Sequence, residues 1–331
     1  MSTMSEALLK IEDLSIDYPI AIGTVHAVRG ISLEVEAGQT LGVVGESGSG
    51  KSTMGLAILR LVRAPGKISE GRVLFEGKDL ASLPEEEMRK VRGKDIAMVF
   101  QNPLTSLNPL MRIDQHFYEV LKTHKPEIKK AEARQLIVKI LEDLGIESRR
   151  MGVYPHQLSG GMRQRIMIGL GLVLHPKLVI CDEPTTALDV IVEAGFIDLL
   201  KRLQKEFSLT IVVITHNLGL VAELADRIAV MYAGQVVENA TASEIFHKPL
   251  HPYTQGLIAC VPNIDLDQQT LTTMEGSPPG LVNPPAGCAF APRCPHVMGR
   301  CRIQEPELIE HRPGHKAACW KITHGELNHH E

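Results

Sequence analysis

Hydrophobic and polar positions alternate near the start of the chain. The pattern then changes to a continuous apolar run and a helical periodicity. Residues 8–18 and 30–38 carry apolar side chains at roughly every second position, which is typical of half-buried antiparallel strands. Residues 40–45 form a short continuous apolar run, which predicts a strand buried on both faces. Glycines and a helical pattern over residues 51–62 follow at once, so this part predicts a strand, a loop and a helix in succession.

The middle of the chain has helical periodicity and almost no strand signal. We expect a helical insertion over about residues 103–160, in which Pro126 separates two helices. Apolar runs return at residues 177–183, 209–216 and 227–234, with helical patterns between the earlier runs. Strands that alternate with helices form parallel sheets, so the predicted fold class is α/β, with an antiparallel β subdomain and the helical insertion.

The composition changes again after about residue 245. The next segment is rich in Pro, Gly and His, which predicts a linker to a small tail that carries cysteines. We therefore divide the chain into residues 1–245 and a C-terminal extension over residues 246–331. Cys181 and Cys260 stand alone, whereas four other cysteines crowd the tail. In a cytosolic chain such a cluster indicates a metal or cluster site before it indicates disulfides.

Composition and charge exclude some classes of protein. The chain has 331 residues, of which 44% are hydrophobic and 22% charged, and its net charge is −4. A protein that coats nucleic acid needs a basic surface, so this balance argues against that function. The longest apolar stretch, residues 166–174, is far shorter than the ~20 residues that span a bilayer, and the N-terminus has no secretory pattern. We expect a soluble, cytoplasmic chain.

The glycine-rich loop after the first buried strand matches the phosphate-loop pattern G-x-x-x-x-G-K-S/T. Its glycines let consecutive N–H groups point at phosphate oxygens, and the following helix adds its positive end. Lys51 should reach the β- and γ-phosphates, and Ser52 should ligate Mg²⁺. A Gly/Ser-rich surface turn is the alternative. The predicted ATP-binding residues are Gly45, Glu46, Ser47, Gly48, Ser49, Gly50, Lys51, Ser52 and Thr53.

Two carboxylates follow the apolar run over residues 178–181. Ligands of parallel sheets bind at the carboxyl ends of the strands, so Asp182 is placed to hold Mg²⁺ and Glu183 to act as general base on the attacking water. A strand that merely ends in two exposed acids is the alternative. The phosphate loop in the same chain favours the catalytic interpretation.

A second glycine-rich helix start lies at residues 158–162, where Ser159 is a natural N-cap and Gly160 and Gly161 expose N–H groups. An ordinary helix start explains these residues equally well on physical grounds. At this point the sequence resembles the ATP-binding cassette (ABC) family, whose signature loop is L-S-G-G-Q, over about residues 8–260. Met162 stands where the signature has its final Gln.

The resemblance implies a P-loop NTPase (RecA-like) core and roles for further residues. Tyr18 matches the aromatic residue that stacks on adenine, and Gln101 matches the glutamine that contacts Mg²⁺ and water and senses the permease. Asp189 matches the D-loop, and His216 matches the switch histidine that contacts the γ-phosphate. Asn217 follows His216 where Asp is common. Neither this departure nor Met162 removes a phosphate contact.

The family also implies partners. Two cassettes dimerise head to tail, so that Ser159, Gly160 and Gly161 of one close over ATP held by Lys51 of the other. Residues 247–258 and the segment GCAFAPRCPHVMGRC resemble the ATP-binding subunits of dipeptide and oligopeptide importers, a group that includes nickel importers. The resemblance then implies a heterodimer with a second cassette, two membrane permeases that contact the helical insertion, an extracytoplasmic substrate-binding protein, and a peripheral location on the cytoplasmic face of the membrane.

Other functions remain open on the sequence. The chain could serve a nickel or other small-solute importer, act as a regulatory or nucleic-acid ATPase outside transport, or be a structural metal protein with a vestigial nucleotide site. The net charge argues against binding to nucleic acid. The complete set of hydrolysis residues argues against a vestigial site.

The four cysteines of the tail are spaced C-x5-C-x6-C-x17-C. Four thiolates can hold zinc or a [4Fe-4S] cluster, but this spacing matches neither common pattern. His296, His311 and His315 are alternative zinc ligands, and free thiols or disulfides also remain open. The resemblance to peptide importers favours the [4Fe-4S] cluster over Zn²⁺. Its ligands would be Cys288, Cys294, Cys301 and Cys319.

Overall fold

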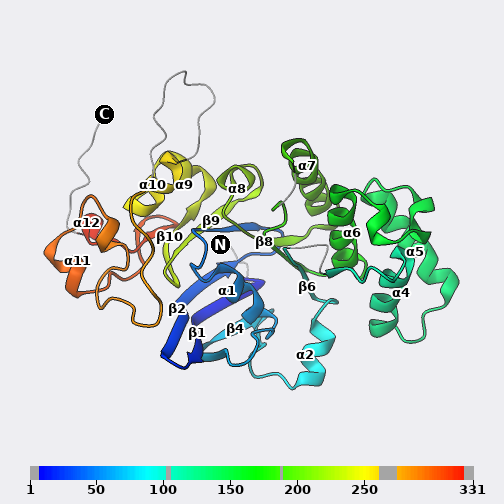
Figure 1. The fold of residues 1–331 in the computed structure, drawn as a ribbon, viewed down its shortest axis with the longest axis horizontal. Coiled ribbons are helices and arrows are strands. Elements are labelled where there is room, and N and C mark those ends of the chain that lie inside the picture. Colours follow the sequence, from blue (N-terminus) through cyan, green and yellow to red (C-terminus); the bar gives the residue numbers. More distant parts are fainter. Residues whose placement is uncertain (1–6, 102–105, 187–188, 261–273, 324–331) are drawn as a thin grey trace, which may run out of the picture. The chain divides into compact units, whose positions relative to one another are not determined.

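A computed structural model of the chain, drawn in Figure 1, describes residues 7–101, 106–186, 189–260 and 274–323. The chain folds as two compact units. The first contains the described parts of residues 35–40 and 82–214, and the second contains those of residues 7–34, 41–81 and 215–331. The phosphate loop and the C-terminal extension therefore belong to the same unit.

The first unit contains a run of parallel strands. β7 (Leu178–Asp182) pairs in parallel with β6 (Ile96–Val99) on one side and with β8 (Thr210–Thr215) on the other. Every residue of β7 and β8 is buried, as the continuous apolar runs predict. Asp182 lies opposite Ile214 in this register, so the carboxyl ends of these strands meet at one edge of the sheet.

Helices make up the rest of the first unit. α4 (Ile113–His124) and α5 (Lys130–Asp143) pack on one another and on α6 (Gly160–Leu172), which confirms helices on both sides of Pro126 (Figure 1). The start of the predicted insertion, residues 103–105, lies outside the described residues. No helix in the described part of the chain is long and apolar enough to cross a membrane. The unit also contains α2 (Glu85–Val91), η1 (Ser148–Gly152), η2 (Pro155–Gln157) and α7 (Val190–Phe207).

The antiparallel subdomain that the N-terminal pattern predicts is present in the second unit. β1 (Leu9–Ile20) pairs antiparallel with β4 (Lys67–Phe75), and the sheet runs in the order β2 (Gly23–Val35), β1, β4, β5 (Lys78–Asp79). Buried and partly exposed residues alternate along β1, as expected for a strand with one face on the core. α1 (Lys51–Ile58) contacts β1 and covers part of that core.

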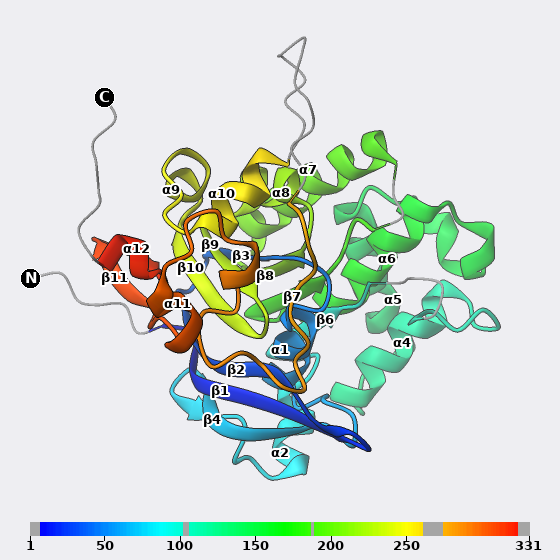
Figure 2. The ribbon, with the colours of Figure 1, turned by 60° about the vertical axis from the view of Figure 1, so that its left-hand side comes forward.

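The C-terminal extension adds strands to a second group of paired strands in the second unit. β3 (Thr40–Val44) pairs in parallel with β9 (Arg227–Tyr232), and β9 pairs antiparallel with β10 (Gln235–Thr241). β12 (His315–Ala317) pairs antiparallel with β10, and β11 (Ile309–Arg312) with β12. Figure 2 shows these last strands, in red, beside β10. The extension therefore packs on the cassette through a shared sheet.

The linker predicted after about residue 245 is wrong for its first part, which is helical. α9 (Ala242–His247) and α10 (Pro252–Ala259) occupy it. Pro252 suits the first helical position, and Nδ1 of His251 accepts the N–H of Tyr253 at 3.0 Å to cap α10. Tyr253 is fully buried, so this segment belongs to the core. The extension also contains η3 (Ala291–Arg293), α11 (Gly299–Ile303) and α12 (Trp320–Thr323).

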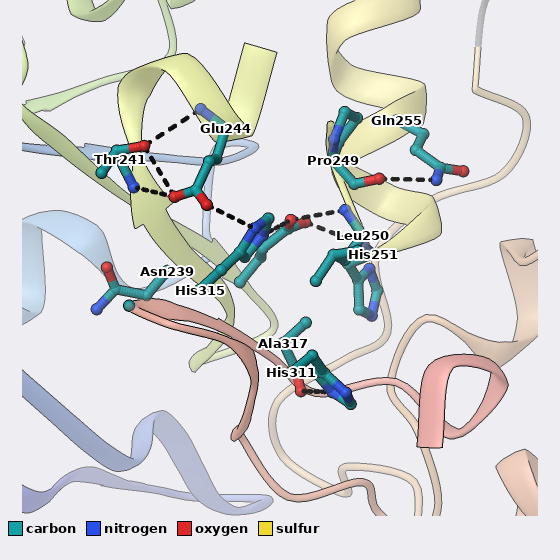
Figure 3. Close-up of polar contacts among 12 residues, drawn as sticks. Asn239, Thr241, Glu244, Pro249, Leu250, His251, Gln255, His311, His315 and Ala317 are labelled. Atoms are coloured by element: carbon teal, nitrogen blue, oxygen red, sulfur yellow. Dashed lines mark hydrogen bonds and ion pairs between the residues drawn. The ribbon is translucent and has the colours of Figure 1, made fainter. Parts of the chain in front are cut away.

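A buried carboxylate fastens the extension to β10. Glu238 has no exposed surface and accepts the N–H groups of Leu250 (2.7 Å) and His251 (2.9 Å). It also shares a hydrogen bond with Nε2 of His315 at 2.7 Å. Figure 3 shows its partners Leu250, His251 and His315 close together. Burial alone would raise the pKa of Glu238, but the hydrogen bonds lower it below its ordinary value. Glu238 therefore stays ionised and joins α10 and β12 to one strand.

We predict that Glu238→Gln lowers the free energy of unfolding by about 3 kcal/mol at pH 7, because an amide leaves a buried donor without an acceptor. Denaturant unfolding, with hydrogen exchange of the β12 amides, measures the loss. Because the pKa of Glu238 is lowered, its contribution is complete above pH 4.5 and is lost as the pH falls further. The variant should lack that acid-dependent loss.

Glu307→Gln is the matched control, since Glu307 is an exposed carboxylate of the extension itself. Its free energy of unfolding should stay within about 0.5 kcal/mol of the wild-type value. Wild-type stability and wild-type exchange in Glu238→Gln would show that the buried carboxylate does not hold the extension.

Candidate functional site

The loop after β3 turns tightly at three glycines, Gly45, Gly48 and Gly50, whose φ angles are +151°, +79° and +98°. A Cβ on Gly45 would lie 2.1 Å from the carbonyl oxygen of Met231, and one on Gly50 would lie 2.3 Å from that of Ala27. The loop backbone thus packs directly on β9 and β2. Glycine is required at both positions for steric reasons, in addition to the backbone conformation.

Lys51 lies across the loop. Its Nζ donates to the carbonyl oxygens of Gly45 and Glu46, both at 2.8 Å, and to Oγ of Ser49 at 3.3 Å. Only 6% of Lys51 is exposed. Gly50 is the N-cap of α1, and no side chain caps the helix there. Because α1 begins directly after the loop, its positive N-terminal end lies at the loop. The arrangement suits an anion with several oxygens.

In the first unit, three predicted site residues meet at the carboxyl edge of the parallel sheet. Val99 of β6 lies opposite Cys181 of β7. Gln101 and Glu183 each follow this pair by two residues, and Asp182 ends β7. Asp182 is 8% exposed, whereas Gln101 is exposed. The structure thus brings an amide and two carboxylates to one edge, as the strand pattern predicts.

Glu183 has an uncommon backbone conformation. Its φ is +49°, in the left-handed region that side chains other than glycine rarely adopt. Its N–H donates to the carbonyl oxygen of Ile214 at 2.8 Å, and Oε2 accepts the hydroxyl of Thr186 at 3.0 Å. Such strained residues cluster at functional sites, where the surrounding structure holds them in place.

The signature loop and the start of α7 pack on one another. Ser159 caps α6 by accepting the N–H of Met162 at 3.3 Å, which confirms the predicted N-cap. Asp189 caps α7 by accepting the N–H of Val192 at 2.9 Å. A Cβ on Gly161 would lie 2.6 Å from Cγ1 of Val192, so the two helix starts are in close contact. The other D-loop residues, 187 and 188, lie outside the described residues.

Tyr18 and His216 lie at strand ends. The ring of Tyr18, on β1, lies so close to Gly66 that a Cβ there would be 2.3 Å from Cε1. His216 is exposed directly after β8. Asn217, where the family commonly has Asp, caps α8 (Leu218–Leu224) through its side-chain oxygen, so the amide serves this position well. The nucleotide contacts of Tyr18 and His216 stay predictions.

The cysteines of the extension converge. A cavity of about 20 Å³ is lined by all four, together with His296 and Trp320. The N–H of Cys288 donates to the carbonyl oxygen of Cys301 at 2.8 Å. Burial, and then the neighbouring thiols, raise the pKa of Cys288 to about 11. Four thiols around one cavity are a donor set that suits iron–sulfur clusters and zinc. The four are Cys288, Cys294, Cys301 and Cys319.

The metal centre itself is not confirmed. Among the described residues, no three or more His, Cys, Asp or Glu side chains are arranged so that they could hold a metal ion. Two of the histidines weighed as zinc ligands are engaged elsewhere, His315 with Glu238 and His311 through Nε2 with the carbonyl oxygen of Ala317 at 3.1 Å. Cys181 is buried in β7, where burial raises its pKa to about 12.

Two residues that contact the phosphate loop were not identified from the sequence. The hydroxyl of Tyr253 accepts the N–H of Glu46 at 2.9 Å, and Arg293 donates to both carboxylate oxygens of Glu46, at 2.9 and 3.0 Å. Both residues lie in the segments that resemble peptide importers. Arg293 is 247 residues from Glu46, and no local pattern in the sequence connects them.

Known proteins resemble this chain over nearly its whole length. A sequence model of the ABC transporter family matches residues 28–186, and one of the oligopeptide/dipeptide transporter C-terminal region matches residues 237–301. The oligopeptide transport ATP-binding protein OppD of Bacillus subtilis (strain 168) is 47% identical, over 95% of this chain and 89% of that protein. The dipeptide transport ATP-binding protein DppD of the same strain is 44% identical, over 95% of each.

A solved structure of an ATP-binding cassette has a similar fold. A dimeric ATP-binding cassette in a post-hydrolysis state, bound to ADP and Pi, is 28% identical with a TM-score of 0.64, and the match covers 71% of this chain and 98% of that one. The predicted P-loop NTPase fold is thereby confirmed. The chain therefore belongs to the ABC transporter family, among the ATP-binding proteins that carry the oligopeptide/dipeptide transporter C-terminal region.

Proposed function

We propose that this chain hydrolyses ATP as a subunit of an importer that takes up dipeptides or oligopeptides. The phosphate loop, with Lys51 across it and α1 behind it, is the observation that carries the proposal. Relatives named for oligopeptide and dipeptide transport support the substrate class. Import of nickel or another small solute is the alternative, because the permeases and the binding protein select the cargo.

In the proposed hydrolysis of ATP, each predicted site residue has a separate role. The N–H groups of the loop and the helix start bind the β- and γ-phosphates, and Lys51 donates to them. Ser52, Gln101 and Asp182 would hold Mg²⁺, which neutralises phosphate charge when bound. Glu183 accepts a proton from the attacking water. In addition, Tyr18 stacks on adenine and His216 contacts the γ-phosphate.

The face around the signature loop suits a second cassette. Ser159 and Gly160 are exposed and Gly161 is half-buried, and beside them Val190 and Ile191 are 82% and 85% exposed. Apolar side chains grouped on a surface favour contact with a protein. A similar cassette is dimeric in its solved structure. We therefore assign this face to a related, non-identical cassette, so that each signature loop closes on ATP bound by the other chain.

The remaining partners follow from the proposed transport. Residues 1–245 form the nucleotide-binding domain, and residues 246–331 form the importer-specific extension. The helical insertion receives two membrane permeases, and Leu110, which is 84% exposed just before α4, offers an apolar contact there. An extracytoplasmic binding protein delivers the peptide. The chain then works at the cytoplasmic face of the membrane, held there by the permeases.

Glu183→Gln should abolish ATP turnover and preserve ATP binding, because the amide cannot accept the proton of water while Lys51 and Ser52 stay in place. Lys51→Ala should instead weaken binding itself. Phosphate release and calorimetric titration with ATP and Mg²⁺ separate the two effects. Wild-type turnover in Glu183→Gln, measured in a dimer without a second active site, would refute the general-base role.

A tagged chain purified from membranes with its partners tests the assembly. We expect one copy of this chain, one different ABC cassette and two permeases, counted by native mass spectrometry. Two copies of this chain without another cassette would overturn the heterodimer and leave the ATPase assignment intact. Recovery without any membrane protein would favour an ATPase outside transport.

We also propose a [4Fe-4S] cluster on the four cysteines of the extension. Their convergence on one cavity supports it. Zinc on the same four cysteines is the alternative. Ligation would then contribute to the folding of the extension.

Protein purified without oxygen should contain about four irons per chain and absorb broadly in the visible range. Cys301→Ser should lose the iron and the colour, whereas Cys260→Ser, outside the cavity, should keep both. Elemental analysis and absorbance measure the result. One zinc and no iron in the native protein would replace the cluster with a zinc site.

A further inference from the structure

Glu46 places a carboxylate inside the phosphate loop. It is the single acidic residue between Gly45 and Thr53. A triphosphate carries several negative charges, and a carboxylate beside it disfavours binding because like charges repel. A loop that binds ATP with this residue therefore needs a positive group that offsets Glu46 without occupying the place of the phosphates.

Arg293 of the C-terminal extension is such a group. Its Nη1 donates to Oε2 of Glu46 at 2.9 Å and its Nη2 to Oε1 at 3.0 Å, which makes a two-pronged ion pair. The side chain of Arg293 is 6% exposed and that of Glu46 is 24% exposed. Paired hydrogen bonds between arginine and a carboxylate are strong and fix direction as well as distance. The carboxylate is thus turned toward the extension.

The guanidinium is held from other sides as well. Nη1 also donates to the hydroxyl of Tyr232 at 3.3 Å, and Nε donates to the carbonyl oxygen of Glu275 at 3.0 Å. Its central carbon lies 5.8 Å from the ring centres of both Tyr232 and Phe290. Arg293 is therefore fixed in place by groups other than Glu46, and it can act as a preformed partner for the loop.

The backbone of Glu46 is held by the same region. Its N–H donates to the hydroxyl of Tyr253 at 2.9 Å, and Tyr253 is fully buried. The Tyr253 ring lies 4.5 Å from that of Tyr232 and 5.4 Å from that of Phe290, centre to centre. The rings of Tyr232 and Phe290, which also lie beside the Arg293 guanidinium, thus pack against Tyr253 and hold its hydroxyl in place. Both the main chain and the side chain of Glu46 are therefore held by residues of the C-terminal extension.

We propose that Arg293 is a positioning residue for ATP binding, which neutralises Glu46 and keeps its carboxylate turned away from the phosphates. The proposal rests on the role of the phosphate loop given above. It assigns the extension a direct part in nucleotide affinity, besides any part in assembly. An alternative role for Arg293, in which it only ties the extension to the cassette, predicts lower stability but unchanged affinity for ATP.

The test compares variants of the full chain by calorimetric titration with a non-hydrolysable ATP analogue and Mg²⁺, and by ATPase kinetics in the assembled transporter. Arg293→Gln should raise the Kd and the KM about tenfold, the loss expected when one partner of a charged hydrogen-bonded pair is removed. Its kcat at saturating ATP should stay within about threefold of wild type, because Arg293 does not contact the reacting atoms. Arg293→Lys, which keeps the charge, should give an intermediate Kd.

The double variant Glu46→Gln with Arg293→Gln is decisive, because it removes the repulsive charge together with its partner. It should restore the Kd to within about threefold of the wild-type value, because the loop binds phosphate through main-chain N–H groups and Glu46→Gln changes only a side chain. Arg302→Gln is the matched control, since Arg302 is an exposed arginine of the same extension, and its Kd should not change. Thermal unfolding of all variants checks that the extension stays folded, and the rescue remains informative even where Arg293→Gln is unstable.

Wild-type affinity in Arg293→Gln would overturn the proposal, and so would a double variant that binds as weakly as Arg293→Gln alone. Lys51→Ala, titrated in parallel, separates this outcome from a failure of the nucleotide site. If Lys51→Ala loses binding while Arg293→Gln keeps it, the inference about Arg293 alone is wrong. If Lys51→Ala keeps binding, ATP does not occupy this loop.

Discussion

The close approach of the phosphate loop to two neighbouring strands is the constraint on which the site depends. Gly45 abuts the carbonyl oxygen of Met231, and Gly50 abuts that of Ala27. Because no residue with a Cβ fits there, the loop can take this shape only with glycine at both positions. That shape brings Lys51 across the loop carbonyls and leaves the Glu46 side chain facing the extension. The charge of the Glu46 carboxylate in the loop is therefore paired with Arg293, a residue far along the chain.

The extension that carries Arg293 is attached by groups that lie within the same compact unit. The ionised, buried carboxylate of Glu238 accepts donors from α10 and from β12, and β12 extends the sheet beyond β10. An ionic group in the core is costly unless its partners are all present, so the loss of one partner should weaken the attachment. The importer-specific segment and the phosphate loop thus share one folded body.

Local signals in the sequence predicted most of this structure. Each of these signals lies within a few residues of sequence. They are the spacing of Gly45, Gly50 and Lys51, the N-cap at Ser159 and the buried run before Asp182. The prediction of a linker at the start of the extension is wrong, because α10 is short and the Pro and His residues at and before its start resemble loop composition. The pairing of Arg293 with Glu46 is a tertiary contact, and only the folded chain reveals it.

The binding of ATP by residues 45–53 is tested most directly by an experimental structure of the assembled transporter with an ATP analogue and Mg²⁺. We predict the β- and γ-phosphates against the N–H groups of this loop, Glu183 beside the γ-phosphate, and the signature loop of the second cassette on the opposite side. A nucleotide bound elsewhere, with residues 45–53 in contact with no phosphate, would contradict this assignment.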